Sequence, residues 1–127
     1  MRSYGKNYEI FSLTDILIIT IAEQGEIENF FDTSISKFKK TISINFMSYL
    51  LFFRSLKTIL KKKNMTVILF SGGGSTSYRK NFSSYSISKL CLVKLTEILS
   101  HEVKNKKTTF NIIAPGIINS KMTNQIL

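Results

Sequence analysis

Cysteine is nearly absent from this sequence of 127 residues, which contains only Cys91. A single cysteine excludes an internal disulfide bond and favours a reducing compartment. Because Cys91 lies between Leu90 and Leu92, we expect it to be a small core residue rather than a nucleophile.

Long apolar runs and a secretory leader are also missing. The runs at 16–22 and 46–53 are far shorter than the roughly 20 residues that span a bilayer. Polar residues follow Met1 and Arg2, unlike a signal peptide. The apolar content of 43%, with ten Phe and no Trp, is typical of a globular chain. We therefore expect one soluble, cytoplasmic domain over residues 1–127, without a metal site or a membrane partner.

Acidic residues are scarce: 8 Asp and Glu stand against 18 Lys and Arg, so the net charge is +10. Such an excess suits an anionic partner, for example nucleic acid, a membrane surface or a phosphorylated cofactor. The lysines are spread from Lys6 to Lys121, however, and their only run, 61–63, ends a helical pattern where positive charge is favourable. We therefore expect these lysines to be ordinary surface residues, and we expect no nucleic-acid partner. A basic protein that binds nucleic acid or a membrane surface remains an alternative to the hypotheses given below.

Strand and helix patterns alternate along the chain. Residues 15–22 form an apolar, β-branched run that predicts a strand buried on both faces, as in a parallel sheet. Apolar residues at helical spacing predict a long helix over 34–62 and a second over 84–103, with Ser83 or Ser84 as N-cap and Leu90, Val93, Ile98 and Leu99 in the core. Further strands are predicted at 65–70 and 108–114.

This β-α-β-α-β order predicts an α/β fold with a parallel sheet and helices packed on it. Ligands of such sheets bind beyond the carboxyl ends of the strands. Those ends lie at 20–24, at the glycine-rich loop 71–76, and at 115–122 after Pro115-Gly116 stops the last strand. We expect a binding site there.

Tyr85 and Lys89 are four residues apart at the start of the second helix, so their side chains share one face. A free tyrosine has a pKa near about 10, and a neighbouring ammonium group lowers it. The tyrosine could then exchange a proton with a substrate hydroxyl or carbonyl. The pair alone is a weak signal, because the same spacing is common on amphipathic helices.

Its context is more specific. A strand with a Gly-rich end precedes Tyr85, Asn45 stands alone in an apolar helix, and Asn-Ile-Ile-Ala-Pro-Gly-Ile-Ile-Asn-Ser-Lys-Met follows at 111–122. Over about residues 15–124 this ensemble resembles the short-chain dehydrogenase/reductase family, in the subgroup with an SGGG(S/A)T loop. The family contains NAD(P)-dependent oxidoreductases on a Rossmann fold, a doubly wound parallel sheet.

The resemblance implies a role for each matching residue. Tyr85 would be the acid/base, Lys89 would lower its pKa and bind the nicotinamide ribose, and Asn45 would anchor a water of the proton relay. Asn45 could equally be a helix-kinking or backbone-capping residue. The remaining matches imply cofactor contacts, by Pro115 and Gly116 beneath the nicotinamide and by Ile118 and Ser120 at its carboxamide. Pro115-Gly116 could also be an ordinary strand terminator.

Three positions depart from the family pattern. The catalytic serine, 13 residues before the tyrosine, is replaced by Gly72, so that Ser71 or Ser75 would have to supply the hydroxyl. The Asn-Asn-Ala-Gly turn is Ile-Thr-Ile-Ala at 19–22. No strand with a dinucleotide-binding glycine turn can fit before Asp15, where the only glycine is Gly5.

We therefore expect the middle part of such an enzyme, truncated at both ends. It would resemble a carbonyl/alcohol oxidoreductase using NAD or NADP, with little activity alone. The alternative is a non-catalytic remnant or interaction module that docks on a full-length relative through an exposed strand edge. A homo-oligomer through residues 34–62 and 84–103 is also expected, because the family forms dimers through these helices.

Overall fold

The structure is a computed structural model that describes residues 9–103, 107–116 and 118–119. Its elements are β1 (Ile16–Ile19), α2 (Ile35–Ile42), the π-helical segment η1 (Ser43–Met47), α3 (Ser48–Ser55), α4 (Lys57–Lys62), β2 (Met65–Phe70), α5 (Ser83–Glu102) and β3 (Thr108–Ile113). The predicted β-α-β-α-β order is confirmed.

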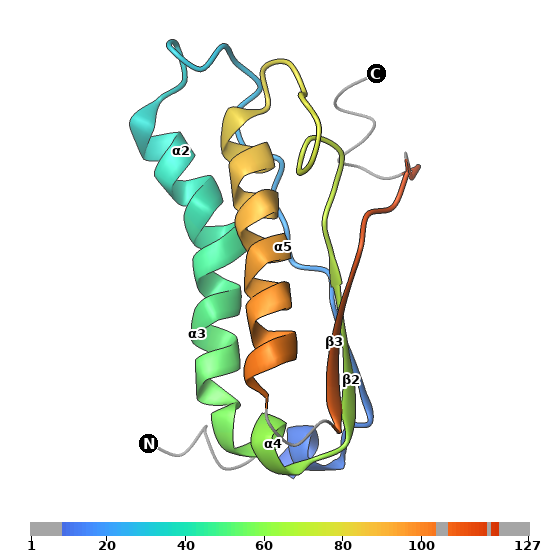
Figure 1. The fold of residues 1–127 in the computed structure, drawn as a ribbon. Coiled ribbons are helices and arrows are strands. Elements are labelled where there is room, and N and C mark those ends of the chain that lie inside the picture. The colour runs from blue at the N-terminus through green and yellow to red at the C-terminus, as the bar shows by residue number, and fades with distance from the viewer. Residues whose placement is uncertain (1–8, 104–106, 117, 120–127) are drawn as a thin grey trace.

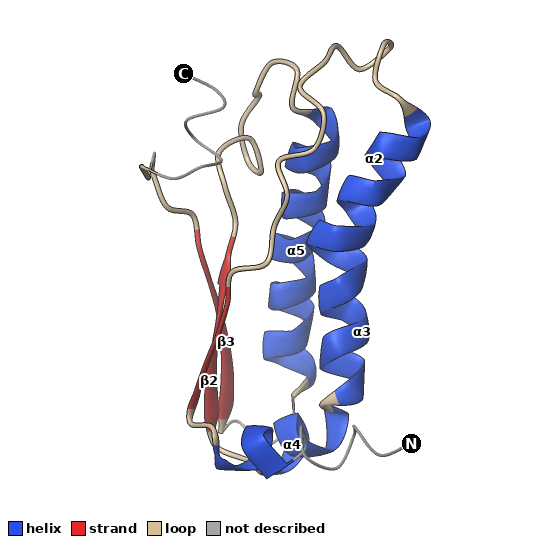
Figure 2. Ribbon diagram, turned by 180° about the vertical axis from the view of Figure 1, so that it is seen from behind, coloured by secondary structure: helices blue, strands red, loops and turns tan. Residues whose placement is uncertain are grey.

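The three strands form a parallel sheet in the order β1-β2-β3. Ile16 pairs with Thr66, and Met65 pairs with Thr108. The helices α2, α3 and α5 lie side by side on one face of this sheet (Figures 1 and 2). The fold is therefore α/β and Rossmann-like, as predicted. No helix in the described ranges is long and apolar enough to cross a membrane.

The core lies between the sheet and these helices. Alternate residues of β2, namely Met65, Val67 and Leu69, are buried, as expected for a strand with one face toward helices. They pack in one cluster with Leu92 of α5. Phe53 and Phe110 meet edge to face with ring centroids 5.5 Å apart, which joins α3 to β3.

The prediction that 15–22 is a strand buried on both faces was wrong. The strand is only four residues long, and Ile16 and Ile18 are 60% and 56% exposed. Both point away from the helices, and no described element covers that face. An apolar sequence indicates that both faces of a strand can be buried, but it does not identify the segment that would cover each face.

The long helix predicted over 34–62 is interrupted twice. A π-helical segment at 43–47 is centred on Asn45, and a break at Leu56 separates α3 from α4. The cause of the first is visible, since Asn45 bonds to the main chain of a neighbouring segment. Nothing in the structure explains the second.

The expected details of α5 were partly wrong. Its N-cap is Phe82, without a side-chain cap bond, rather than a serine. Leu90 and Ile98 are exposed, whereas Leu92 and Thr96 face the core. Cys91, expected in the core, is half-buried. Apolar residues occupy so much of this helix that spacing alone did not identify the inner face.

A mutation on the exposed face of the sheet tests whether another chain covers this face in solution. We expect Ile18→Thr to change the free energy of unfolding by less than about 0.5 kcal/mol, because the side chain is exposed. Leu69→Ala, on the opposite face, should cost about 2–5 kcal/mol. Urea unfolding measures both. A cost for Ile18→Thr that grows with protein concentration would show instead that another chain covers this face.

Candidate functional site

The candidate site lies at the carboxyl ends of the strands, where α5 begins. Tyr85 and Lys89 occupy the first two turns of α5, and both are buried, with Lys89 only 2% exposed. The Lys89 Nζ donates a hydrogen bond of 2.9 Å to the carbonyl oxygen of Phe70, the last residue of β2. Its ammonium is 5.7 Å from the centroid of the Tyr85 ring. The structure thus brings the predicted pair together at the end of β2.

Gly72 forms the wall against which the tyrosine rests. A Cβ atom added to Gly72 would overlap the Tyr85 hydroxyl and come within 3.1 Å of its Cε1. The resemblance described above implies a serine at this position, which has no room for a side chain while Tyr85 keeps this conformation.

Ser71 and Ser75 form a buried pair on the same loop. The Ser71 Oγ donates to the Ser75 Oγ at 2.7 Å, and the Ser71 amide donates to Ile113 O at 2.9 Å, which ties the loop to β3. The Ser71 proton is therefore engaged within the pair, whereas the proton of Ser75 can turn toward another acceptor.

Asn45 connects three segments beneath the site. Its Nδ2 donates to Glu23 O at 2.8 Å and to Ser88 Oγ at 3.1 Å, and its Oδ1 accepts from the Glu23 amide at 2.8 Å. The Ser88 Oγ in turn donates to Tyr85 O at 2.7 Å. Asn45 is fully buried, so these bonds fix the turn of α5 that carries Tyr85.

The electrostatics differ from the expectation that Lys89 lowers the tyrosine pKa. Burial raises the pKa of Tyr85, and the nearby Arg79 charge only partly opposes this. Burial also lowers the pKa of Lys89 to about 8. In this arrangement the tyrosine is a phenol at neutral pH, which suits a proton donor better than a base.

The other predicted cofactor residues lie at the end of β3. Pro115 is half-buried, Ile118 is exposed, and Ser120 lies outside the described residues. A Cβ on Gly116 would meet nothing within 4 Å, so the space above this turn is open. The open space at Gly116 leaves room for a ligand at the end of β3. The glycine-rich loop 71–76 between β2 and α5 lacks the G-x-G-x-x-G spacing, and Tyr85, Arg79 and Ser86 occupy the space at Gly72 and Gly74, so this loop does not fit the pyrophosphate of a dinucleotide.

Sequence reasoning missed two residues that shape the site. Gly25, with φ +74°, lies so close to the helices that a Cβ would come within 2.5 Å of Thr41 Oγ1 and 2.8 Å of Ser84 Oγ. Ser88, which bridges Asn45 and Tyr85, is also fully buried. Ser88 follows Tyr85 by three residues and therefore lies on the same helix face, and this spacing could have predicted its role.

Comparison with known proteins identifies the family. The family model described as "Enoyl-(Acyl carrier protein) reductase" matches residues 6–127. A 3-oxoacyl-(acyl-carrier-protein) reductase FabG of Rickettsia prowazekii is 31% identical over 90 residues, which are 70% of this chain and 37% of that protein. Human dehydrogenase/reductase SDR family member 4 is 26% identical over 113 residues, or 88% of this chain and 41% of that protein.

Solved structures agree. A short-chain dehydrogenase/reductase from Saccharomyces cerevisiae has a TM-score of 0.81 at 25% identity, over 88% of this chain and 44% of that one. A short-chain dehydrogenase from Salmonella enterica has a TM-score of 0.84 at 16% identity, over 98% of this chain and 55% of that one. The chain belongs to the short-chain dehydrogenase/reductase family of oxidoreductases, and it spans less than half the length of the two curated relatives named above.

The contact between Gly72 and Tyr85 can be tested by restoring the family's serine. We expect Gly72→Ser to displace the phenol and to destabilise the chain by about 1–3 kcal/mol, as overpacking does. Urea unfolding and ultraviolet titration of the tyrosines measure both effects. Gly73→Ala is the matched control, because its Cβ would have 3.8 Å to the nearest atom. If Gly72→Ser changes neither the free energy of unfolding nor the titration of the tyrosines, the close contact between Gly72 and the Tyr85 hydroxyl is contradicted.

The buried Lys89 predicts a pH dependence of stability. Its pKa of about 8 in the fold lies below the ordinary value, so between these values the unfolded chain binds more protons and stability rises with pH. From pH 8 to 10 we expect a gain on the order of 2–3 kcal/mol. Above about pH 10 the raised pKa of Tyr85 reverses the trend, since the unfolded tyrosine ionises first.

Urea unfolding at several pH values checks this rise. Lys89→Met should abolish it, whereas Lys94→Met, an exposed lysine of the same helix, should retain it. An equal slope in Lys89→Met and the unchanged chain would show that another group causes the dependence.

Proposed function

We propose that this chain carries the acid/base part of an NAD(P)-dependent carbonyl/alcohol oxidoreductase site. The observation that carries the proposal is the burial of Tyr85 and Lys89 together at the carboxyl end of β2, in a chain of this family. Parallel α/β sheets bind their ligands at this edge. The substrate class is a small carbonyl compound or the corresponding alcohol.

Tyr85 is the proton donor to the carbonyl oxygen during reduction. Its raised pKa keeps the phenol protonated until charge develops on that oxygen. Lys89 lies beside the Tyr85 ring with a pKa of about 8, and by the family resemblance it would bind the nicotinamide ribose. When bound, NAD(P)H supplies the hydride.

The remaining residues position these groups. Asn45 holds the Tyr85 turn through Ser88, and by the family resemblance it would anchor a water of the proton relay. Ser71, through its bond to Ser75, would supply the hydroxyl for the substrate oxygen. Pro115, Gly116 and Ile118 would line the nicotinamide end; Ser120, assigned there by the family resemblance, lies outside the described residues. Relatives of this fold have been solved with NADP and with NAD+ bound, which supports this class of cofactor.

Residues 1–127 act in this proposal as a single partial domain without the dinucleotide-binding glycine turn. Dinucleotide affinity in Rossmann folds depends on that turn and the helix after it. The chain alone then has little activity. It becomes competent when the nucleotide-binding half of such a fold is present.

Exposure of β1 favours the alternative, a non-catalytic module that docks on a full-length relative. Within the described sheet, β1 pairs with β2 only, and its Ile16 and Ile18 are exposed. An unpaired apolar edge strand is a template for another chain. Size-exclusion chromatography with light scattering tests this proposal, and a clean monomer that does not bind a relative contradicts it.

Self-association through 34–62 and 84–103 is favoured by a different surface. A groove of about 480 Å³ between α3, α4 and α5 contains Leu50, Phe53, Leu95 and Leu99. Leu51, Leu90 and Ile98 are exposed on the same two helical segments. The same light-scattering experiment distinguishes this dimer, because Leu51→Lys should dissociate it and Ile18→Thr should not.

The catalytic proposal is tested by complementation. The chain is mixed with the nucleotide-binding N-terminal part of the Rickettsia reductase, NADPH fluorescence reports binding, and ethyl acetoacetate serves as a 3-oxo probe. We expect binding and slow turnover in the mixture and neither in the chain alone. Tyr85→Phe should lower turnover by about 100- to 10,000-fold while NADPH binding persists.

Lys94→Met, which changes an exposed residue of the same helix, is the control and should leave turnover unchanged. Turnover by the pure chain would contradict the expected low activity. Equal turnover with Tyr85→Phe and with the unchanged chain would remove Tyr85 from the chemistry. If the mixture binds neither NADH nor NADPH, the result would favour the docking alternative.

A further inference from the structure

A cavity of about 420 Å³ opens beside the start of α5, and the roles proposed above do not use it. One wall is the segment 29–31, and the other is the loop 74–81 with the first turn of α5. Phe30, Phe31 and Tyr78 line it and are largely exposed. Exposed aromatic rings around a concave surface are typical of a site for an apolar ligand body.

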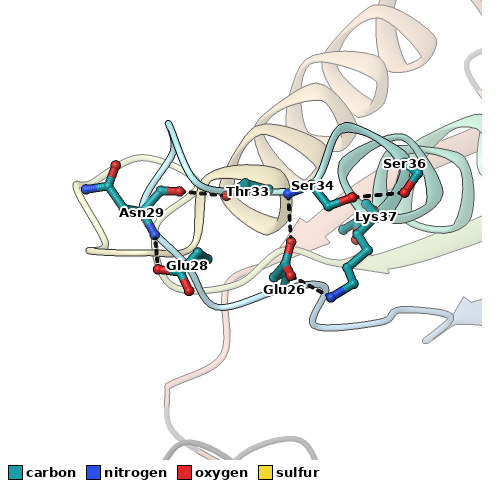
Figure 3. A network of polar contacts seen from close by, with 8 residues as sticks. Glu26, Glu28, Asn29, Thr33, Ser34, Ser36 and Lys37 are labelled. Carbon is teal, nitrogen blue, oxygen red and sulfur yellow. Dashed lines mark hydrogen bonds and ion pairs between the residues drawn. The ribbon is translucent and has the colours of Figure 1, made fainter.

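The segment that forms the first wall is held in place by polar contacts (Figure 3). The Glu26 carboxylate accepts from the Ser34 amide at 2.9 Å and from Lys37 Nζ at 2.6 Å, and Thr33 Oγ1 donates to Asn29 O at 2.9 Å. The Glu28 amide donates to Asn81 O at 3.0 Å, which joins this wall to the opposite one. The cavity is therefore bounded by ordered backbone on both sides.

Arg79 is the only charged residue among the described residues of the cavity wall. Its guanidinium stacks on the Phe82 ring, 3.7 Å from the centroid. No carboxylate within the described ranges forms an ion pair with it, and the adjoining acid, Glu28, accepts from the Asn29 amide instead. A guanidinium stacked by one face keeps its edge N–H donors available for a planar anion.

Arg79 also lies close to the proposed acid/base group. A Cβ on Gly73 would lie 3.8 Å from Arg79 Nη1, whereas one on the preceding Gly72 would meet the Tyr85 hydroxyl. Gly72 and Gly73 are consecutive, and their Cα atoms are therefore about 3.8 Å apart. The Tyr85 hydroxyl and the Arg79 guanidinium thus lie against neighbouring residues of the loop. The Arg79 charge also acts on the pKa of Tyr85, so the two groups are neighbours, although the cavity wall itself contains Arg79 and not Tyr85.

Gly74 keeps this loop against α5. Its φ is +89°, and a Cβ there would come within 2.5 Å of Ser86 Oγ and 2.8 Å of Arg79 Cβ. The hydroxyls of Ser83 and Ser86 are buried in the cavity wall and have no hydrogen-bond partner in the described residues. Protein atoms cover both hydroxyl oxygens, so they belong to the support of the wall rather than to its exposed surface.

We propose that this cavity recognises a carboxylate-bearing carbonyl compound with an apolar or aromatic body, and that Arg79 binds the carboxylate through its free edge. Phe30, Phe31 and Tyr78 contact the body. The carbonyl then lies toward Tyr85, and this last step alone rests on the proposed oxidoreductase function. Arg79 is a specificity-determining residue in this arrangement.

Binding without cofactor tests the recognition separately. Benzoylformate, an aromatic 2-oxo acid, and its uncharged methyl ester are titrated into the chain by calorimetry at about 0.15 M salt, which screens the general positive charge. We expect the acid to bind at least about 10-fold more tightly than the ester, since the charged pair is bidentate. Arg79→Gln should remove this preference.

Lys80→Gln is the matched control, because it removes one positive charge from the same loop outside the cavity wall. It should retain the preference, and Tyr85→Phe should retain it too, even though turnover in the complemented mixture is lost. Equal binding of acid and ester, no binding by the folded chain, or an equal loss in Arg79→Gln and Lys80→Gln would overturn the proposal.

Circular dichroism confirms that each variant is folded. If Arg79→Gln does not fold, Arg79→Lys takes its place, since it keeps the charge and lacks the planar fork. We then expect a loss of acid binding of about 3- to 10-fold with the ester unaffected, and an unchanged acid affinity would overturn the proposal. Absence of NADPH binding in the complementation experiment would refute the oxidoreductase function without affecting this result.

Discussion

The hydrogen bonds between the Asn45 side chain and the main chain of Glu23 are the constraint on which the site depends. A single amide satisfies both backbone groups of Glu23 beyond β1 and also reaches Ser88 on α5. It therefore joins the end of a strand, a π-helical turn and the helix that carries Tyr85. Because Asn45 and Ser88 are fully buried and Glu23 is half-buried, replacing the amide would leave both backbone groups of Glu23 without their present partner.

Burial controls the chemistry that the two central residues can perform. The sequence places an amine and a phenol on one helix face, and from this we expected the amine to promote phenolate formation. In the fold, burial dominates both groups: the pKa of Tyr85 rises and that of Lys89 falls to about 8. Lys89 Nζ, moreover, bonds to Phe70 O. The outcome is a neutral proton donor beside a readily titrated amine.

Glycine has a structural role at this site that differs from a phosphate-binding role. Gly72 gives the tyrosine hydroxyl its space, and Gly74 brings Arg79 and Ser86 against the loop. The family's serine and the present tyrosine conformation exclude each other sterically. The loop is thus organised around Tyr85 and Arg79, and its buried hydroxyls are those of the Ser71–Ser75 pair.

The sequence by itself determined the order of elements and the parallel sheet, and it predicted Tyr85 and Lys89 on one face of a helix that begins after a strand end. Asn45 was singled out as a polar residue in an apolar helix, and its role came from the family resemblance. The order of elements, the sheet and the shared helix face follow from local periodicity and from spacing along the chain, which are visible in one dimension. Only the tertiary structure decided that β1 has a bare face, that α5 turns Leu92 rather than Leu90 inward, and that Arg79 faces a cavity next to Tyr85. These features depend on which segments meet in space, and burial, pKa values and cavities arise from such contacts between residues distant in the chain.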